Sequence, residues 1–183
     1  MDSDIRRRFT FLDLFRILGG VLLLNVILSY SLTGTTTWGY AGKHLNPRYY
    51  LSLINQSSQE FTIDRLSLYN GTDSSLPIYV SVNGTVFDVS YGRDMYGPGG
   101  RYHLFAGHDY SRLFVNGCFK NTDQWTSDLR GLDKVDSQNK LTSWIHYYTD
   151  HPQYWKVGEL KLPELETTEP PPICNDGLKF PRY

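Results

Sequence analysis

Residues 77–114 read PIYVSVNGTVFDVSYGRDMYGPGGRYHLFAGHDYSRLF, and they carry the clearest structural signals in the chain. It opens with two runs rich in β-branched and aromatic residues, 78–82 and 85–89, which flank Asn83-Gly84. Asn-Gly suits a type I′ turn, because both central residues of that turn need a positive φ. The sequence therefore predicts a β-hairpin over residues 78–89.

The second half of the stretch is rich in glycine. Gly-Pro-Gly-Gly at residues 97–100 should exclude a helix and place Tyr96 and Tyr102 on an irregular loop. Beyond that loop, Asp109 can begin a short helix and Gly117 can end it, with Leu113 and Phe114 facing inward.

The flanking sequence predicts three more elements. Thr62 can cap a short helix, with Ile63 and Leu66 on its apolar side. Residues 141–148 form a further helix candidate, with Trp144, Ile145 and Tyr148 on one side, and residues 154–162 read as a strand or extended return. Together these elements predict one α+β domain over residues 61–162. A connector without sustained periodicity precedes it at 33–60, and a Pro- and Glu-rich tail, extended or mobile, follows at 163–183.

An apolar run lies near the start of the chain. Residues 17–32 read ILGGVLLLNVILSYSL, in which Asn25 is the strongly polar interruption. Counted from Phe9, the apolar stretch reaches the roughly 20 residues that cross a hydrocarbon core. We therefore expect a cytosolic N-terminus at 1–14 and a transmembrane signal anchor at 15–32. A cleaved secretory signal is the alternative. It is disfavoured because the stretch lacks a cleavage site with small residues and continues into TGTTTWGY.

Positive charge flanking the apolar run predicts its orientation. Only two positive residues, Lys43 and Arg48, follow the run nearby. Four arginines precede it: Arg6, Arg7, Arg8 and Arg16. The positive-inside rule then places the C-terminal domain in the lumen of the endoplasmic reticulum or another secretory-pathway compartment, as a single-pass protein. Three Asn-x-Ser/Thr sites follow the run and could be glycosylated there: Asn55, Asn70 and Asn83. Cys118 and Cys174 could pair or remain free thiols, and the sequence favours neither.

Composition and missing motifs exclude several functions. The 183 residues carry 18 Lys+Arg against 19 Asp+Glu, so the chain lacks the basic surplus of a nucleic-acid binder. Two cysteines exclude a cysteine-rich metal centre, and among the histidines only His103 and His108 have a spacing that resembles a metal site. The sequence contains no GxSxG, GxxxxGK[ST] or HExxH motif, and we expect no enzymatic activity.

The stretch quoted above, with FTIDRL at 61–66 and YWKVGEL at 154–160, resembles the membrane-associated progesterone receptor family. Members carry a cytochrome b5-like haem/steroid-binding domain, typically behind one N-terminal anchor. The resemblance covers residues 61–162 and implies a cytochrome b5-like fold in which a small sheet and short helices form a pocket. It implies a membrane-anchored haem- or steroid-binding accessory protein that supports sterol/lipid or haem-thiolate enzymes, with an integral membrane enzyme or complex as partner.

The resemblance also implies a set of site residues. Tyr102 matches the tyrosine that is the axial ligand of the haem iron, Tyr96 a second pocket tyrosine, and Tyr154 a third hydroxyl near the propionates. The family's GxDxSR motif, which begins the pocket helix, is matched by Asp109, Ser111 and Arg112. A phenolate is a hard anionic ligand that suits ferric iron, and the HPGG loop of electron-carrying cytochrome b5 is absent. We therefore do not expect fast electron shuttling.

Three positions depart from the family pattern. His108 stands where the family usually has arginine, Tyr110 where it has alanine, and Gln153 where some members have lysine. Loss of two positive charges would weaken pairing with propionates. The alternative function is therefore a ligand-free lumenal interaction subunit of a membrane complex with a vestigial pocket, in which Tyr96 and Tyr102 only anchor their loop.

Overall fold

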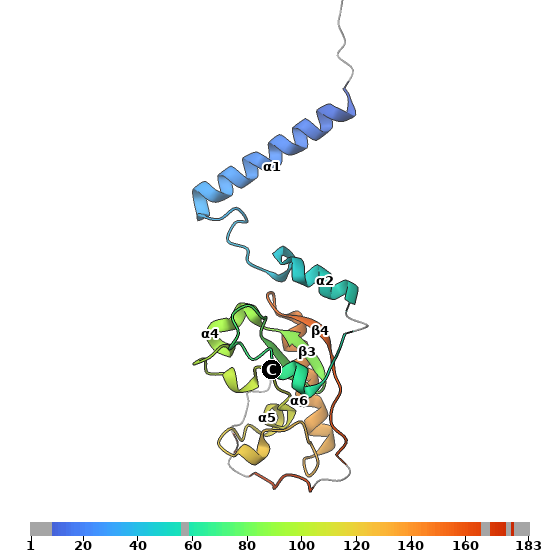
Figure 1. Ribbon diagram of the computed structural model, residues 1–183. Coiled ribbons are helices and arrows are strands. Elements are labelled where there is room, and N and C mark those ends of the chain that lie inside the picture. Colours follow the sequence, from blue (N-terminus) through green and yellow to red (C-terminus); the bar gives the residue numbers. More distant parts are fainter. Residues whose placement is uncertain (1–8, 56–58, 166–168, 175–176, 178–183) are drawn as a thin grey trace, which may run out of the picture. The chain divides into compact units, whose positions relative to one another are not determined.

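The computed structural model describes residues 9–55, 59–165, 169–174 and 177. It divides into an anchor unit up to Ala41 and a domain unit from Gly42 onward, and each is described by itself (Figure 1). The elements are, in order, α1 (Phe11–Thr33), η1 (Lys43–Leu45), α2 (Pro47–Asn55), β1 (Glu60–Phe61), α3 (Ile63–Ser67), β2 (Tyr79–Val82), β3 (Thr85–Asp88), η2 (Ser90–Gly92), α4 (Arg93–Tyr96), η3 (His103–Phe105), α5 (Ser111–Asn116), η4 (Thr122–Gln124), α6 (Lys134–Asp150) and β4 (Trp155–Leu160).

The anchor unit consists of α1 and the loop that follows it. Among the described residues, α1 is the one helix that is long and apolar enough to cross a membrane. It begins at Phe11, before the predicted start at residue 15, because the Asp13 carboxylate accepts the N–H of Thr10 at 3.0 Å and caps the first turn. Gly34, with φ 70°, ends the helix by donating its N–H to the Tyr30 carbonyl.

The loop after α1 folds back onto the helix. The Trp38 indole N–H donates to Asn25 Oδ1 at 3.1 Å, and the Trp38 backbone N–H donates to Ser29 Oγ at 2.7 Å. Ser29 in turn donates to the Thr35 carbonyl at 2.6 Å. A polar group without a partner is costly in hydrocarbon, so this loop explains how Asn25 is tolerated in an apolar helix.

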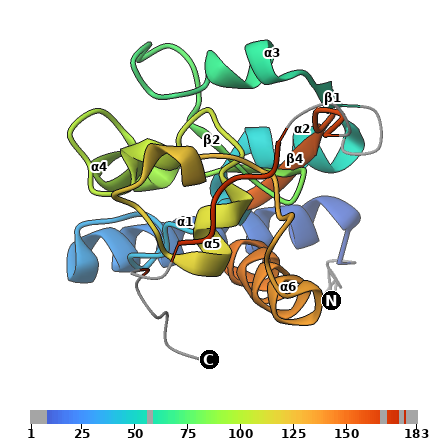
Figure 2. The same ribbon diagram turned by 90° about the horizontal axis from the view of Figure 1, so that it is seen from below.

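The domain unit is built on a four-stranded sheet with the order β1-β4-β3-β2. Strands β1, β2 and β4 can be found by their labels in Figure 2. β1 is parallel to β4, whereas the β4–β3 and β3–β2 pairs are antiparallel. The predicted hairpin is confirmed: Asn83 (φ 50°) and Gly84 (φ 81°) form its turn. The predicted strand at 154–162 is confirmed as β4, and it occupies the centre of the sheet.

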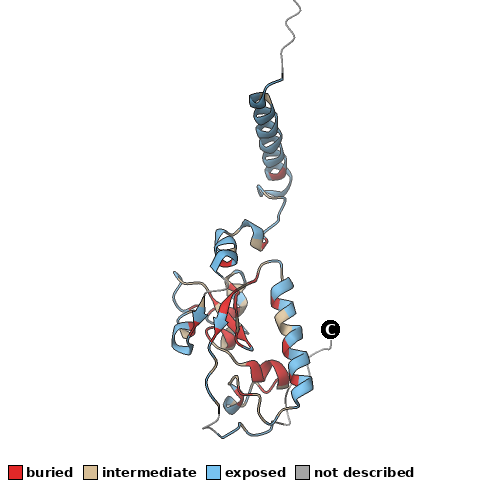
Figure 3. Cartoon of the chain, turned by 90° about the vertical axis from the view of Figure 1, so that its right-hand side faces the viewer, coloured by how far each residue is buried: buried red, intermediate tan, exposed pale blue. Residues whose placement is uncertain are grey.

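The buried residues form two hydrophobic clusters, and Figure 3 colours the buried parts of the chain red. One cluster contains Phe87 with α5 and α6 residues such as Leu113 and Leu141. The other contains Val86 with Phe61 and further residues of α3 and β4. Val86 and Phe87 are adjacent, and successive strand residues point to opposite faces, so β3 is buried on both sides.

Several local predictions need correction. A helix does form beside the glycine-rich loop: α4 ends at Tyr96, so the exclusion of helix applies only from Gly97 onward. The helix predicted over 141–148 is α6 and begins earlier, at Lys134, because the Asp133 carboxylate caps it by accepting the Asp136 N–H at 2.7 Å. Ile63, expected on an apolar side, is exposed, while Leu66 is buried.

The segment predicted as a connector without periodicity also contains structure. Helix α2 lies within it and packs on β4, where the ring of Tyr49 contacts that of Trp155 at 5.9 Å between centroids. The packed domain therefore extends beyond the predicted range 61–162 and includes α2.

The described part of the tail has no helix or strand, as predicted, yet it is tied to the domain. Gln124 Nε2 donates to the Pro172 carbonyl at 2.8 Å, and Arg112 Nη2 donates to the carbonyls of Pro171 and Pro172 at 3.4 and 3.3 Å. Cys118 and Cys174 form a disulfide, which resolves the alternative left open by the sequence.

The disulfide gives a first prediction. The double variant Cys118→Ser/Cys174→Ser should lower the free energy of unfolding by about 2–4 kcal/mol, because the bridge constrains the unfolded chain. Chemical denaturation of the detergent-solubilised full chain, followed by tryptophan fluorescence, measures this. Reductant should destabilise the native chain to the level of the variant and leave the variant unchanged. Equal stability of the native chain and the variant, each with and without reductant, would contradict a stabilising bridge.

Candidate functional site

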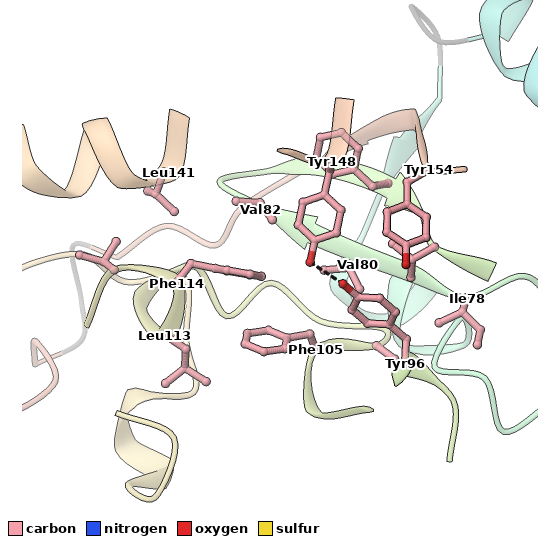
Figure 4. Close-up of a cluster of buried hydrophobic side chains, with 14 residues drawn as sticks. Ile78, Val80, Val82, Tyr96, Phe105, Leu113, Phe114, Leu141, Tyr148 and Tyr154 are labelled. Carbon is pink, nitrogen blue, oxygen red and sulfur yellow. Dashed lines mark hydrogen bonds between the residues drawn. The ribbon is translucent and has the colours of Figure 1, made fainter. Parts of the chain in front are cut away.

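Four tyrosines gather between α4, the loop after it, α6 and β4, and we call them the tyrosine cluster: Tyr96, Tyr102, Tyr148 and Tyr154. The ring of Tyr96 lies 5.8 Å from that of Tyr102 and 6.0 Å from that of Tyr154, measured between centroids. Tyr148 and Tyr154 are 6.0 Å apart. Figure 4 shows Tyr148 and Tyr154 reaching toward Tyr96 from the opposite side. The three tyrosines implied by the family resemblance are thus brought together.

The centre of the cluster is a buried hydroxyl pair. The hydroxyls of Tyr96 and Tyr148 are 3.0 Å apart and form a hydrogen bond, and their residues are only 3% and 2% exposed. Burial raises the pKa of both phenols above the ordinary value, because a phenolate would lose its hydration. Both therefore stay protonated at neutral pH and act as a structural pair.

Tyr102 lies at the open edge of the cluster. Its residue is 40% exposed, and its hydroxyl has no hydrogen-bond partner among the described residues. Its backbone N–H donates to the Met95 carbonyl at 2.8 Å, which folds the loop against α4. Gly97 and Gly100 permit this fold, since a Cβ at either would lie 2.5 Å or less from a carbonyl of α4.

Tyr154 is held on both sides. Its ring stacks on His151 with centroids 3.7 Å apart and planes 10° apart, and its hydroxyl occupies the space that a Cβ on Gly92 would fill. Burial raises the pKa of Tyr154 to about 12. Burial, followed by the charge of Lys43, lowers the pKa of His151, so its imidazole is neutral at pH 7.

Asp109 is placed as part of the frame. Its carboxylate accepts from Ser81 Oγ at 2.6 Å and from the Gly84 N–H at 2.8 Å, and its other oxygen accepts the Ser111 N–H at 3.1 Å. It therefore ties the hairpin to the start of α5. These contacts explain Asp109 and Ser111 without a ligand.

Arg112 is fully buried and holds three separate segments together. Its guanidinium donates to Gln124 Oε1 at 2.7 Å and to the carbonyls of Asp128 and Arg130 at 2.9 and 2.8 Å, besides the two tail carbonyls. None of the hydrogen bonds that Arg112 makes with described residues reaches the tyrosine cluster. Its assignment as a haem-binding residue thus gains no support from its contacts.

The departures from the family pattern have a structural explanation at two positions. His108 and Tyr110 stack on each other with centroids 4.8 Å apart and planes 7° apart. Burial lowers the pKa of His108, so it carries no charge at neutral pH. The pair is therefore a packing unit that replaces the cation usual at this position.

Tyr148 belongs to the tyrosine cluster although neither the sequence pattern nor the family resemblance pointed to it. The pattern placed it only with Trp144 and Ile145 on one side of its helix. A usable signal existed: Tyr148 follows Leu141 by seven residues, two helical turns, and so shares its buried face.

The three glycosylation sites differ in setting. Asn83 is exposed at the hairpin turn, whereas Asn70 is half-buried and its Oδ1 accepts from the N–H and hydroxyl of Thr72 at 2.9 and 2.7 Å. Asn55 is exposed at the end of α2, but Gln56 and Ser57, which complete its site, lie outside the described residues.

Sheet order, helices and tyrosine cluster together define a cytochrome b5-like fold. Residues 62–160 match the family described as the Cytochrome b5-like Heme/Steroid binding domain. This is more than half of the 183 residues, and the chain belongs to that family.

Curated relatives agree with this assignment. The chain is 43% identical over 100 residues to Membrane-associated progesterone-binding protein 4 of Arabidopsis thaliana, covering 55% of this chain and 39% of that protein. It is 47% identical over 85 residues to Probable steroid-binding protein 3 of the same plant, covering 46% and 83%. Neuferricin of Danio rerio is 42% identical over 100 residues, covering 54% and 36%. The chain thus spans less than half the length of two of these relatives.

A solved structure is also similar. An Arabidopsis thaliana protein described as having a cytochrome b5-like fold is 43% identical, with a TM-score of 0.47, covering 56% of this chain and 90% of that one.

The buried pair gives a second prediction. Tyr148→Phe or Tyr96→Phe should each lower the free energy of unfolding by about 1–3 kcal/mol, because the remaining buried hydroxyl loses its partner. The double variant should cost less than the sum of the two. Tyr91→Phe, at an exposed residue, serves as control and should change stability by no more than about 0.5 kcal/mol. Additive losses in a double-mutant cycle would contradict the pairing.

Proposed function

We propose that this chain is a membrane-anchored haem- or steroid-binding protein in which Tyr102 is the ligand of the haem iron. The observation that carries the proposal is that the tyrosines of the cluster differ in hydrogen bonding and exposure. Tyr96 and Tyr148 use their hydroxyls on each other, while the Tyr102 hydroxyl is exposed and has no partner among the described residues.

The donor set fits the group. The Tyr102 hydroxyl lies at the solvent-facing edge, where an iron can reach its oxygen, whereas Tyr96 and Tyr148 are bonded to each other and kept neutral by burial. The Arg101 guanidinium lies 6.0 Å from the centre of the Tyr102 ring. It supplies positive charge beside the proposed position of haem, whose two propionates are anionic. Haem, when bound, supplies a redox-active iron; the chain supplies the ligand atom at the open edge of the tyrosine cluster.

The exposed ring of Tyr102 also offers an aromatic contact to a steroid, which is flat and largely apolar. We propose a binding role and no catalysis. The names of the relatives support a membrane-associated steroid-binding function. We also propose that the partner is an integral membrane enzyme of sterol/lipid or haem-thiolate chemistry, and this proposal rests only on the family resemblance.

A hemin titration of the purified full chain in detergent tests the ligand. We expect saturable binding with a shifted Soret band, and Tyr102→Phe should abolish the shift or weaken binding at least about tenfold, the equivalent of roughly 1.4 kcal/mol. Tyr50→Phe is the matched control, because Tyr50 is exposed on α2 and its ring contacts Tyr49. An unchanged spectrum in Tyr102→Phe would reject Tyr102 as the ligand.

The alternative is a ligand-free interaction subunit. It is favoured by the close packing of Tyr96, Tyr148 and Tyr154, each no more than 3% exposed, which leaves only Tyr102 open. Hemin and steroid that both fail to bind the folded chain, together with stoichiometric recovery of one integral membrane partner, would select it.

We further propose that α1 is retained as a signal anchor and that the domain lies in the lumen of the endoplasmic reticulum or a related compartment. The excess of arginine before α1 supports this orientation. The Cys118–Cys174 disulfide supports an oxidising compartment, since such bonds are rare in the cytosol.

Glycosylation tests the orientation. Expressed in cells, the chain should lose mass on endoglycosidase treatment, and Asn83→Gln should remove part of that loss because Asn83 is exposed at its turn. The domain should resist protease in sealed vesicles. An unglycosylated chain whose domain is digested outside intact vesicles would place it in the cytosol.

A further inference from the structure

Helix α2 is amphipathic in the reverse of the usual sense. A surface helix ordinarily turns its apolar side to the protein and its polar side to water. At 3.6 residues per turn, Arg48, Tyr49 and Ser52 share one side of α2, and this inner face is the one that packs on the domain.

The inner face is joined to the rest of the domain by an ion pair and a ring contact. The Arg48 guanidinium lies 3.7 Å from the carboxylate of Asp88, which is buried, and Ser52 is buried with its hydroxyl donating to the Tyr49 carbonyl at 2.7 Å. Tyr49 adds its ring contact with Trp155. These contacts fix which way α2 faces, because rotating it would strip Asp88 of its counter-charge.

The opposite side, which we call the outer face of α2, is apolar and exposed. It consists of Tyr50, Leu51, Leu53 and Ile54, and Ile54 is 76% exposed. Leu45, just before the helix, is exposed as well. Four adjacent large apolar side chains on a nine-residue helix mark an interaction site, since scattered single residues would be expected on an ordinary surface.

The position of α2 in the chain indicates what covers this face. Residues 42–46 alone separate Ala41, the last residue of the anchor unit, from Pro47 at the start of α2. Five residues span at most roughly 18 Å. A chain held in a bilayer by α1 therefore cannot carry α2 far from the bilayer surface. Leucine, isoleucine and an amphipathic tyrosine are also the residues that enter the boundary between headgroups and acyl chains.

We propose that the outer face of α2 inserts into the surface of the lipid bilayer that α1 crosses, as a second membrane contact that holds the domain at the membrane. The inference rests on the proposed retention of α1, but it is independent of haem or steroid binding. The polar inner face then joins α2 to the domain, and the apolar outer face joins it to lipid.

Environment-sensitive fluorescence tests this in the full chain reconstituted into phosphatidylcholine/phosphatidylserine vesicles. A nitrobenzoxadiazole label is attached at Ile54→Cys, and at Val135→Cys as control, because Val135 is also apolar, on α6, and 70% exposed. Cys118 and Cys174 are paired and do not compete for label. Intact mass confirms beforehand that α1 is present.

We expect the Ile54 label to emit at shorter wavelength than the Val135 label, to be quenched by spin-labelled lipid, and to be several-fold less sensitive to aqueous iodide. Adding Leu51→Asp should raise its iodide sensitivity to that of the control. Iodide sensitivity equal to that of the Val135 label would overturn the proposal. So would protection without quenching by lipid, which would mean that a second copy or the chain itself covers the face.

Discussion

The hydrogen bond between the hydroxyls of Tyr96 and Tyr148 joins two parts of the chain that are 52 residues apart. It connects the end of α4 to the buried side of α6, inside the main hydrophobic core. Two phenols without partners there would each cost free energy, so the pair constrains α4 and α6 to one relative position. The glycine-rich loop starts immediately after Tyr96, and the same constraint therefore determines where Tyr102 emerges. The hydroxyls of Tyr96 and Tyr148 are satisfied by each other, while the side chain of Tyr102 stays exposed.

A second set of polar contacts keeps this arrangement in register with the sheet. Asp109 bonds the hairpin turn to α5, and Arg112 bonds α5 to the segment 124–130 and to the tail. Both belong to the sequence motif that resembles the family's pocket helix, and in this chain their contacts are with the protein itself. A buried guanidinium is stable only when its donors are satisfied, which explains why the tail, bridged through Cys174, belongs to the fold.

Local signals in the sequence were sufficient for the hairpin at Asn83-Gly84, for α5 between Asp109 and Gly117, and for β4. They failed where the deciding contact is distant. Helix α2 was missed because its apolar side faces away from the domain, and Tyr148 was not assigned to the site because its partner is across the fold. The acceptors of Arg112 are backbone carbonyls, which no side-chain pattern reveals. The three site tyrosines came from family resemblance, and their proximity came from the structure.

We propose that the exposed Tyr102 hydroxyl, and none of its neighbours in the cluster, bonds the haem iron. Resonance Raman spectroscopy of the full chain loaded with ferric hemin, using tyrosine deuterated on the ring, tests this bond. We expect iron-phenolate ring modes that shift on deuteration, persist in Tyr96→Phe and Tyr154→Phe, and disappear in Tyr102→Phe. Phenolate modes that survive in Tyr102→Phe, or a loaded native chain that shows none, would contradict it.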